Sequence, residues 1–389
     1  MSYGQEMQLE VYGTPRSASE APLPFACEDW ETRAREALSD EAYWYVAGGA
    51  GGGDTMRANR EAFYRWRIRP RLLTDVTDRN LMVEIFGKRY PAPVLLAPVG
   101  VQGILHADGE AAPARAAAAL GVPIVLSNVS SITLEEVAAA MGDSPRWFQL
   151  YPGSNRDVMQ SALDRAEASG YSAIVVTLDT KMLGWREADL KGGYLPFARG
   201  HGIANYLSDP AFRALLARTP EEDPRAAIML FLSLFTNPAM SWKDIEWIRS
   251  RTRLPLLLKG VLDPEDARIA VDKGASGMIV SNHGGRQVDG AVAALDALPS
   301  VVGAVGSEVP VLMDSGVRRG ADVIKAIALG ARAVLVGRPY AYALAAAGEE
   351  GVRHYLRCLL ADIDINLALS GRRSLSELDR SMVELSPMQ

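Results

Sequence analysis

The sequence predicts an α/β fold of the (β/α)8 TIM-barrel type, with an N-terminal helical extension and a long insertion after the fourth strand. Three observations support this: eight short apolar runs, amphipathic segments between them, and polar residues directly after the runs. The apolar runs are continuous rather than alternating, which is typical of strands covered on both faces in a parallel sheet. Eight strand-helix units in succession favour closure into a barrel.

The segment before the barrel predicts one helix, from Cys27 to Leu38, because its pattern is amphipathic. Aromatic residues then pass into glycines in the run from Tyr43 to Asp54. A plain flexible linker is one interpretation of such a glycine run. The aromatic residues before it favour the other, a tether that lays Tyr45 over a pocket.

The barrel itself begins near Pro93. We expect its strands at 94–98, 123–127, 147–151, 173–178, 254–259, 277–281, 309–314 and 333–337. Periodic segments rich in Ala and Glu predict helices at 110–120, 134–141, 157–169, 264–273 and 321–329. In such a barrel the catalytic groups stand at the carboxyl ends of the strands.

One interval of about sixty residues separates Asp179 from the capping-box sequence Ser241-Trp-Lys-Asp244. Insertions of this length at the catalytic end of a barrel are usually functional. We therefore expect residues 187–240 to form an active-site lid. Its apolar stretch 228–235 is too short to cross a bilayer and predicts a short buried or interface helix.

Composition excludes several classes of protein. The chain has 389 residues, 48% of them hydrophobic, which suits one large barrel domain over 1–389. A net charge of −6 argues against nucleic acid as a partner. The sequence shows no signal peptide and no spanning segment, so we expect a cytoplasmic protein without a membrane partner. Cys27 and Cys358 have no metal-ligand spacing, and we expect them reduced, buried and structural.

The stretch from Ser281 to Gln287 follows the sixth predicted strand and reads Ser-Asn-His-Gly-Gly-Arg-Gln. His283 titrates near neutral pH, and Arg286 carries a guanidinium that binds carboxylates through paired hydrogen bonds. The glycines between them let the chain turn sharply and approach a ligand. A histidine satisfied within an ordinary turn is the alternative, but the glycine pair and the arginine favour a base and an anion clamp on one loop.

Polar side chains follow nearly every predicted strand. They are Ser127, Gln149, Tyr151, Thr177, Asp179 with Arg186, Lys259, His283 with Arg286, Asp314 to Arg319, and Arg338. Any one of them has an ordinary explanation as a strand-end group satisfied by the backbone. Their recurrence after successive strands favours a single shared site.

The last two units predict a phosphate cradle. Asp314-Ser-Gly316-Val-Arg318-Arg319-Gly320 and Gly337-Arg338 supply turn glycines, backbone N–H groups, a helix N-terminus and guanidinium groups. Many barrels bind a phosphorylated substrate or cofactor in this way, so the cradle alone is only moderately specific. The sequence shows no Cys-His or carboxylate cluster that suggests a metal. Redox chemistry here would therefore require an organic cofactor.

Taken together, these motifs resemble the FMN-dependent L-2-hydroxy acid oxidase and dehydrogenase family. The resemblance runs from Trp30 to Leu375 and rests on Ser281–Gln287, Asp314–Gly320 and Gly337-Arg-Pro339. Within the family, the chain most resembles lactate 2-monooxygenase. That likeness rests on Tyr45-Val-Ala-Gly-Gly, Leu178-Asp-Thr180, Gly184-Trp-Arg186 and the long segment through Asn205-Tyr206 and Asp209-Pro210 to Trp242.

The resemblance implies a (β/α)8 domain that binds FMN. Its cofactor-binding positions would be Pro98, Val99, Gly100, Ser127, Gln149, Thr177, Lys259, Ser281, Asp314, Gly316, Arg318, Gly337 and Arg338. Lys259 would stabilise the anionic reduced ring, and Arg318 and Arg338 would take the phosphate. The family also implies a homo-oligomer, a tetramer or an octamer.

For the substrate, the resemblance implies that Arg186 and Arg286 bind the carboxylate, supported by Tyr45 and Tyr151. His283 would be the base, made more basic by Asp179. The reaction implied is oxidation of a lactate-like L-2-hydroxy acid with O2, giving acetate, CO2 and water in the monooxygenase case. The alternative is an oxidase that releases the keto acid and H2O2 from a bulkier substrate.

Four residues depart from the pattern of close relatives: Lys181, Met182, Pro152 and Val129. They concern the substrate rather than the chemistry. Gly100 also bears on the outcome, because a glycine beside the flavin changes the space open to oxygen. An FMN-barrel isomerase is the rival enzyme, since it would share the phosphate cradle. A non-catalytic flavin-binding protein would not need His283 and Asp179 together.

Overall fold

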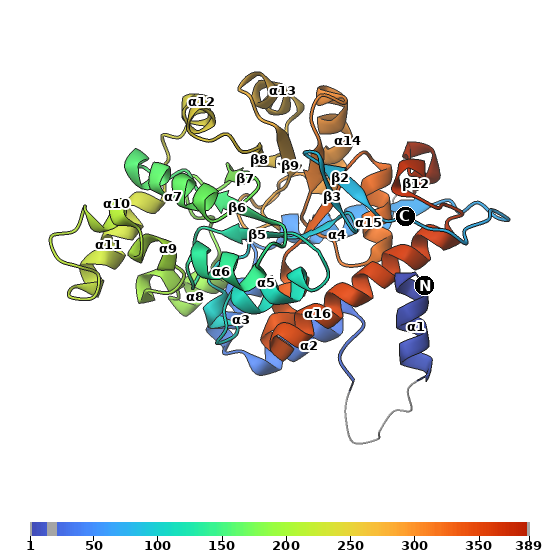
Figure 1. Cartoon of the computed structure of the whole chain (residues 1–389), viewed down its shortest axis with the longest axis horizontal. Coiled ribbons are helices and arrows are strands. Elements are labelled where there is room, and N and C mark those ends of the chain that lie inside the picture. Colours follow the sequence, from blue (N-terminus) through green and yellow to red (C-terminus); the bar gives the residue numbers. More distant parts are fainter. Residues whose placement is uncertain (1, 14–21, 387–389) are drawn as a thin grey trace.

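Eight parallel strands close into a barrel in the computed structural model, which describes residues 2–13 and 22–386. Figure 1 shows the strands surrounded by helices. In chain order the strands are β4 (Val94–Leu96), β5 (Ile124–Ser127), β6 (Arg146–Leu150), β7 (Ile174–Thr177), β8 (Leu256–Val261), β9 (Gly277–Val280), β10 (Val311–Met313) and β11 (Val334–Val336). The barrel closes where β11 pairs with β4. All eight predicted strands are confirmed.

Apolar residues that alternate along each barrel strand face two different cores. One set fills the barrel interior: Leu95, Val125, Trp147, Val175, Leu257, Ile279, Leu312 and Leu335. Their neighbours along each strand belong to the larger core under the helices. The hairpin β2 (Val83–Ile85) and β3 (Lys88–Tyr90) adds Val83, Ile85 and Tyr90 to the interior cluster. The hairpin therefore closes the amino-terminal end of the barrel with apolar side chains.

The helices around the barrel include the five predicted ones and the one expected after Ser241, whereas those at 294–305 and 338–369 were not predicted. In chain order the helices are α5 (Ala111–Ala118), α6 (Leu134–Met141), α7 (Arg156–Ala168), α12 (Trp242–Arg251), α13 (Pro264–Asp272), α14 (Ala294–Val305), α15 (Gly320–Ala328) and α16 (Arg338–Leu369). Local sequence explains several starts, since Thr133 and Glu136 form a capping box before α6 and Asp263 caps α13. The backbone of α16 leaves helical geometry at Ala347 and Gly348, so it is two helices joined at a kink.

The N-terminal extension is helical, as predicted. It comprises α1 (Tyr3–Gly13), α2 (Cys27–Ala37), α3 (Asp40–Ala47) and α4 (Asp54–Arg65), and α1 and α2 pack on α16 (Figure 1). After α4, β1 (Trp66–Ile68) pairs with β12 (Val383–Leu385) near the other end of the chain. The glycine run after α3 is not a free linker, because Ala50 N–H donates to the carbonyl of Gly285 at 2.8 Å.

The insertion after β7 forms a layer of short helices beside α6 and α7, at the left of Figure 1. It contains α8 (Glu187–Gly192), η2 (Pro196–Arg199), α9 (Ala204–Leu207), α10 (Pro210–Arg213) and α11 (Pro224–Phe235). The expected short helix at 228–235 is the last two-thirds of α11. The capping box before α12 is confirmed, because the Asp244 carboxylate accepts from Ser241 N at 2.9 Å and Ser241 Oγ at 3.1 Å.

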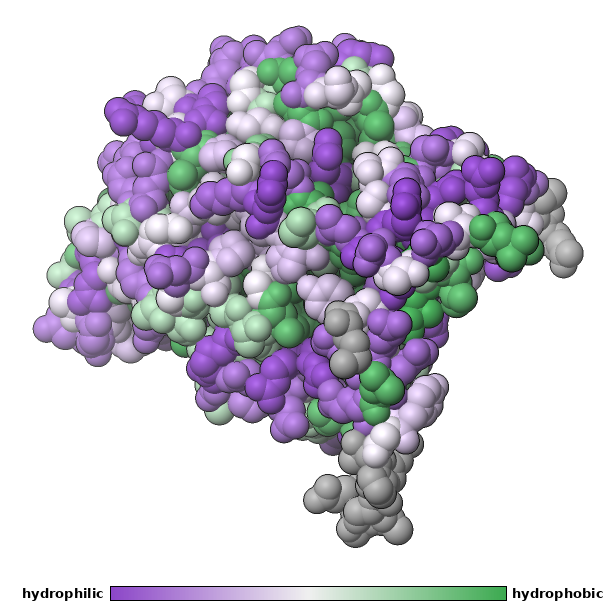
Figure 2. Space-filling model, turned by 45° about the vertical axis from the view of Figure 1, so that its right-hand side comes forward, coloured by the Kyte–Doolittle hydropathy of each residue, from purple (hydrophilic) through white to green (hydrophobic). Residues whose placement is uncertain are grey.

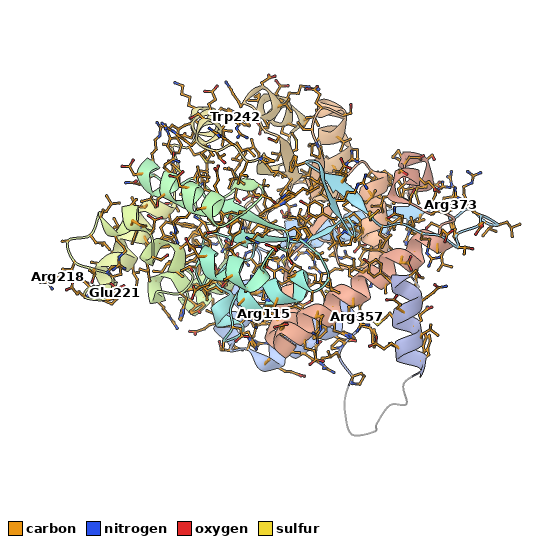
Figure 3. All side chains as sticks on the ribbon, in the orientation of Figure 1. Arg115, Arg218, Glu221, Trp242, Arg357 and Arg373 are labelled. Atoms are coloured by element: carbon orange, nitrogen blue, oxygen red, sulfur yellow. The ribbon has the colours of Figure 1, made fainter. Side chains whose placement is uncertain are left out.

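An aromatic cluster holds the insertion together. Phe231 stacks on Phe235 at 5.2 Å between ring centroids, and Phe197 contacts both rings at 5.4 Å. Asn205 Nδ2 ties α9 to the barrel by donating to the Asn128 carbonyl at 3.1 Å. Figure 3 shows Arg218 and Glu221 at the outer tip, far from the barrel strands. The inner, aromatic side of the insertion is therefore the side that meets the barrel.

The surface shown in Figure 2 carries small groups of hydrophobic side chains among hydrophilic ones. Within the described residues, no helix has the length and apolar character needed to cross a membrane. Both cysteines carry free thiols, and Cys27 is buried as expected. Cys358 is only half-buried, because α16 leaves it at the edge of its packing face near His354. Burial raises the pKa of Cys27 to about 11, so this thiol stays protonated.

Candidate active site

A cavity of about 150 Å³ opens at the carboxyl ends of the barrel strands. Loops after most of the strands contribute to its wall, and so do α3, η2 and α11. The predicted site residues that line it are Tyr45, Pro98, Val99, Gly100, Tyr151, Arg186, Lys259, His283, Arg286, Asp314, Gly316, Arg318, Gly337 and Arg338. Residues scattered over nearly 300 positions thus meet in one place, as parallel strand ends require.

The other predicted residues, Ser127, Gln149, Thr177, Asp179 and Ser281, lie buried or half-buried behind this wall. Ser127 Oγ donates to Gln149 Oε1 at 3.0 Å. Among the described residues, Gln149 Nε2 and Thr177 Oγ1 are buried without a hydrogen-bond partner. Buried polar atoms are nearly always paired. These two strand ends are therefore built for a ligand with polar groups along its edge.

His283 and Asp179 form the central pair. The two atoms His283 Nδ1 and Asp179 Oδ1 lie 2.7 Å apart, and Thr180 Oγ1 donates to the same carboxylate oxygen at 3.0 Å. A proton on Nδ1 satisfies this contact and leaves Nε2 as the acceptor. His283 has a left-handed backbone with φ of 58°, held by the donation of its N–H to Ser281 Oγ at 3.1 Å.

The charges of this pair follow from its surroundings. Burial raises the pKa of Asp179, but the positive charges of His283 and Lys259 and two hydrogen bonds bring it down to about 2. Burial lowers the pKa of His283, and Asp179 opposes that shift only in part. The pair therefore consists of an ionised carboxylate and a neutral imidazole at neutral pH, which is the state a base needs.

Lys259, on β8, lies between the pair and the predicted phosphate cradle. Its Nζ donates to Ser281 Oγ at 2.9 Å and lies 3.4 Å from Asp314 Oδ2 and 3.9 Å from Asp179 Oδ2. Burial lowers the pKa of Lys259, but the two carboxylates outweigh burial and raise it overall. The site thus keeps a buried cation at its base.

Arg186 and Arg286 face the cavity from two loops. Arg286 Nη1 donates to the Gly48 carbonyl at 2.9 Å, and its guanidinium lies 5.3 Å from the centre of the Tyr45 ring. Burial and the nearby Arg186 lower the pKa of Arg286 to about 9, which leaves it charged at neutral pH. The nearest carboxylate, Asp189 Oδ2, is 3.9 Å from Arg186 Nη1. Two guanidiniums with one distant counter-ion favour an anionic ligand.

Tyr45 and Tyr151 come from α3 and from the residue after β6, respectively. Burial raises the pKa of both phenols, so both stay protonated and can donate hydrogen bonds. The ring of Tyr151 meets Phe235 edge-on at 5.2 Å between centroids. The glycine-run tyrosine therefore does lie over a pocket, as the tether interpretation expected.

Arg338 has a role that the sequence analysis missed. Its Nε donates to the Val46 carbonyl at 2.9 Å, Nη1 to Gly284 at 2.7 Å and Nη2 to Gly48 at 2.8 Å. The guanidinium expected to bind phosphate thus holds the end of α3 against the loop of His283. The guanidinium of Arg318 has fewer protein partners. Its one side-chain hydrogen bond in the described chain goes to the Val317 carbonyl at 3.0 Å, so its other N–H groups can bind a ligand.

Part of the cavity wall was also not anticipated. Thr180, Leu183, Phe197 and Phe235 line it, beside Val129, which was already expected to bear on the substrate. The apolar stretch at 228–235 was the only signal for Phe235, and it indicated packing rather than a site. Four of these five side chains are apolar, so they form a hydrophobic side to a pocket whose other side is charged.

Comparisons with known proteins give matches over nearly the whole chain. The family model for FMN-dependent dehydrogenase matches residues 34–385. The chain is 43% identical over 360 residues to an L-lactate oxidase of Lysinibacillus sphaericus, covering 92% of each protein. It is 46% identical over 353 residues to the FMN-dependent alpha-hydroxy acid dehydrogenase qulF of Penicillium citrinum, covering 90% of this chain and 88% of that one. A crystal structure of mandelate oxidase superposes with a TM-score of 0.83 at 40% identity, covering 94% of this chain and 100% of the other.

Proposed function

This chain belongs to the family of FMN-dependent dehydrogenases, and from that premise we propose that it oxidises a lactate-like L-2-hydroxy acid to the 2-keto acid with O2 as the electron acceptor. The observation that carries the proposal is the His283–Asp179 pair, 2.7 Å apart, in a cavity that also holds two arginines. Oxidation of R-CH(OH)-COO⁻ needs an anion clamp, a base and a two-electron acceptor. The chain supplies the first two, and FMN supplies the third when bound.

The site fits FMN. The unpartnered atoms Gln149 Nε2 and Thr177 Oγ1 would hydrogen-bond the polar edge of the isoalloxazine ring, and Lys259 would supply a cation that stabilises the reduced ring. Backbone groups at Gly316 and Gly337 and the side chain of Arg318 would take the phosphate. A Cβ at Gly100 would lie 2.7 Å from Val129 Cγ2 and from the Val129 carbonyl, so only a glycine packs there. That glycine keeps the cavity wall flat next to Pro98 and Val99.

The substrate would be held by its carboxylate, which Arg186 and Arg286 bind, with Tyr45 and Tyr151 as hydroxyl donors. The 2-hydroxyl group would then lie on the side of His283. His283 Nε2 accepts the proton that leaves the substrate, and Asp179 stabilises the resulting imidazolium through Nδ1. The substituent on C2 would then face the apolar wall of Val129, Phe197 and Phe235.

Reoxidation of the reduced flavin by O2 would form H2O2, and the insertion would determine whether this H2O2 leaves the site or reacts there. We propose that residues 187–240 act as a lid, because Phe197 and Phe235 of this segment line the cavity. A closed lid would retain the keto acid and H2O2 together, and attack of peroxide on the keto acid would give acetate, CO2 and water from lactate. The relatives named as oxidases support the second candidate, in which keto acid and H2O2 leave separately, and the mandelate oxidase among them supports a substrate bulkier than lactate.

The test is anaerobic mixing of the purified flavoprotein with L-lactate and with larger L-2-hydroxy acids, while the oxidised flavin absorbance is followed. Rapid bleaching supports the proposal. Admission of O2 and measurement of peroxide, keto acid and decarboxylated acid then separates monooxygenase from oxidase. Absence of bleaching with every 2-hydroxy acid would overturn the proposal and favour an FMN-barrel isomerase, which would share the phosphate cradle but would not need the arginine pair.

A further inference from the structure

Gln287 ends the loop that carries His283 and Arg286, and the proposed function gives it no role. Its side-chain amide makes three hydrogen bonds to one neighbouring segment. Nε2 donates to the Asp179 carbonyl at 2.7 Å and to the Met182 carbonyl at 2.9 Å. Oε1 accepts from Arg186 Nη2 at 3.0 Å. A single amide therefore contacts both ends of the segment 179–186, which contains the partner of the base and half of the anion clamp.

The two segments also fit closely along their backbones. A Cβ on Gly184 would collide with the carbonyl oxygens of Arg286 and Gln287, so the segments approach as closely as a glycine allows. Arg186 Nε donates to the Arg286 carbonyl at 3.2 Å. Reversal of the Gln287 amide would place its NH2 against a guanidinium and its oxygen against two carbonyls. The amide orientation is therefore fixed by its neighbours.

The contacts of Arg186 show that the Gln287 amide helps to fix the Arg186 guanidinium in place. Nε is bound to Arg286 and Nη2 to Gln287, whereas Nη1 has no hydrogen bond within the described chain and lies 3.9 Å from Asp189 Oδ2. A long side chain held at two nitrogens loses most of its rotamer freedom before a ligand arrives. The third nitrogen is left for a carboxylate.

We propose that Gln287 is a positioning residue, which sets Arg186 and Asp179 at the distance from Arg286 and His283 that the substrate requires. The proposal rests on the proposed function, in which Arg186 binds the substrate carboxylate. It adds that the clamp is preorganised by an amide on the loop of the base, so that substrate binding and proton removal depend on the same side chain.

The test uses the FMN-loaded protein and oxalate, a dicarboxylate probe whose binding is followed by the change in oxidised flavin absorbance. Gln287→Met keeps the length of the side chain and removes all three hydrogen bonds. We expect it to raise the dissociation constant of oxalate about tenfold, the loss typical of one hydrogen bond to a charged group. Gln287→Glu places a carboxylate on Arg186, and we expect a loss of about 100-fold because it competes with oxalate. Val288→Ala, at a side chain that is 66% exposed in the same loop, should bind oxalate as the wild type does.

A double-mutant cycle separates positioning from a general loss of structure. If Gln287 acts through Arg186, Gln287→Met adds nothing to the oxalate dissociation constant of Arg186→Ala. Wild-type affinity in Gln287→Met with full FMN content, or an additive effect on Arg186→Ala, overturns the proposal. Should Gln287→Met lose FMN, Gln287→Leu, which also removes the three hydrogen bonds and adds no charge, takes its place in the same cycle. Wild-type protein that binds oxalate but is not bleached by any 2-hydroxy acid would refute the proposed function alone.

Discussion

Asp179 and His283 lie 2.7 Å apart although they follow β7 and β9, which are not neighbours in the barrel. The strand between them, β8, contributes Lys259, whose Nζ is 3.9 Å from Asp179 Oδ2. The Asp179 carboxylate can therefore stabilise two cations: the His283 imidazolium that forms on proton transfer and the Lys259 ammonium, which is always charged. The buried lysine keeps Asp179 ionised before the base has taken any proton.

Replacement of the base, His283→Gln, should leave FMN bound and slow flavin reduction by an L-2-hydroxy acid about 10²- to 10⁴-fold. The reason is that, among the described residues, only His283 combines a contact with Asp179 and a second ring nitrogen that can accept the substrate proton. Stopped-flow absorbance under anaerobic conditions measures the rate. Thr180→Val is the matched comparison, since it keeps the base and removes a hydroxyl that lies 3.0 Å from Asp179 Oδ1 and 3.4 Å from His283 Nδ1, and we expect a loss below about tenfold. Near-normal reduction in His283→Gln would remove His283 from the chemistry.

The pH dependence of stability should carry the signature of His283. Burial lowers its pKa in the folded protein, so between that value and about 6.5 the unfolded chain binds a proton that the folded chain does not. The free energy of unfolding of the flavin-free protein therefore falls as the pH drops through about 6.5. Urea unfolding at several pH values should show a smaller fall in His283→Gln. An equal fall in both proteins would mean that other groups are responsible.

The aromatic wall should control both stability and substrate size. Phe235 is 5% exposed and contacts three other rings, so Phe235→Ala should lower the free energy of unfolding by about 3 kcal/mol or more. It should also raise kcat/KM for a phenyl-bearing 2-hydroxy acid relative to lactate, because it enlarges the apolar side of the cavity. Met229→Ala, at a 59% exposed position of the same helix, is the control for both measurements. An unchanged substrate ratio in Phe235→Ala would place the C2 substituent elsewhere.

Loss of the Arg338 guanidinium should loosen the link between α3 and the loop of His283. Arg338→Met leaves the carbonyls of Val46, Gly48 and Gly284 without this donor, and we expect a loss of about 3 kcal/mol in the free energy of unfolding. Thermal unfolding measures the loss, and Arg332→Met, at an exposed arginine six residues earlier, is the control. Equal melting temperatures would show that Arg286 alone holds this helix end.

The barrel and much of the site could be predicted because their signals are local. Each strand is a short, mostly apolar run, and most of the predicted site residues lie at the end of such a run or in the loop that follows it. Arg338 shows the limit of such reasoning. Its partners are backbone carbonyls, which leave no trace in side-chain pattern, and Val46 lies 292 positions away. Phe197 and Phe235 were not predicted as site residues for a related reason. The sequence pattern of an aromatic residue is the same whether it only packs within the insertion or also faces a cavity.

The hairpin β2–β3, which closes the amino-terminal end of the barrel, affects how molecules reach and leave the cavity. With Val83, Ile85 and Tyr90 packed into the interior, the barrel offers no rear exit, and the apolar core blocks passage along the axis. Under the proposed function, the hydroxy acid, oxygen and products would therefore enter and leave the cavity at the carboxyl ends of the strands, where the insertion lies. Whether peroxide is released or consumed would then depend on two rates, the departure of the keto acid from the cavity and the attack of peroxide on it.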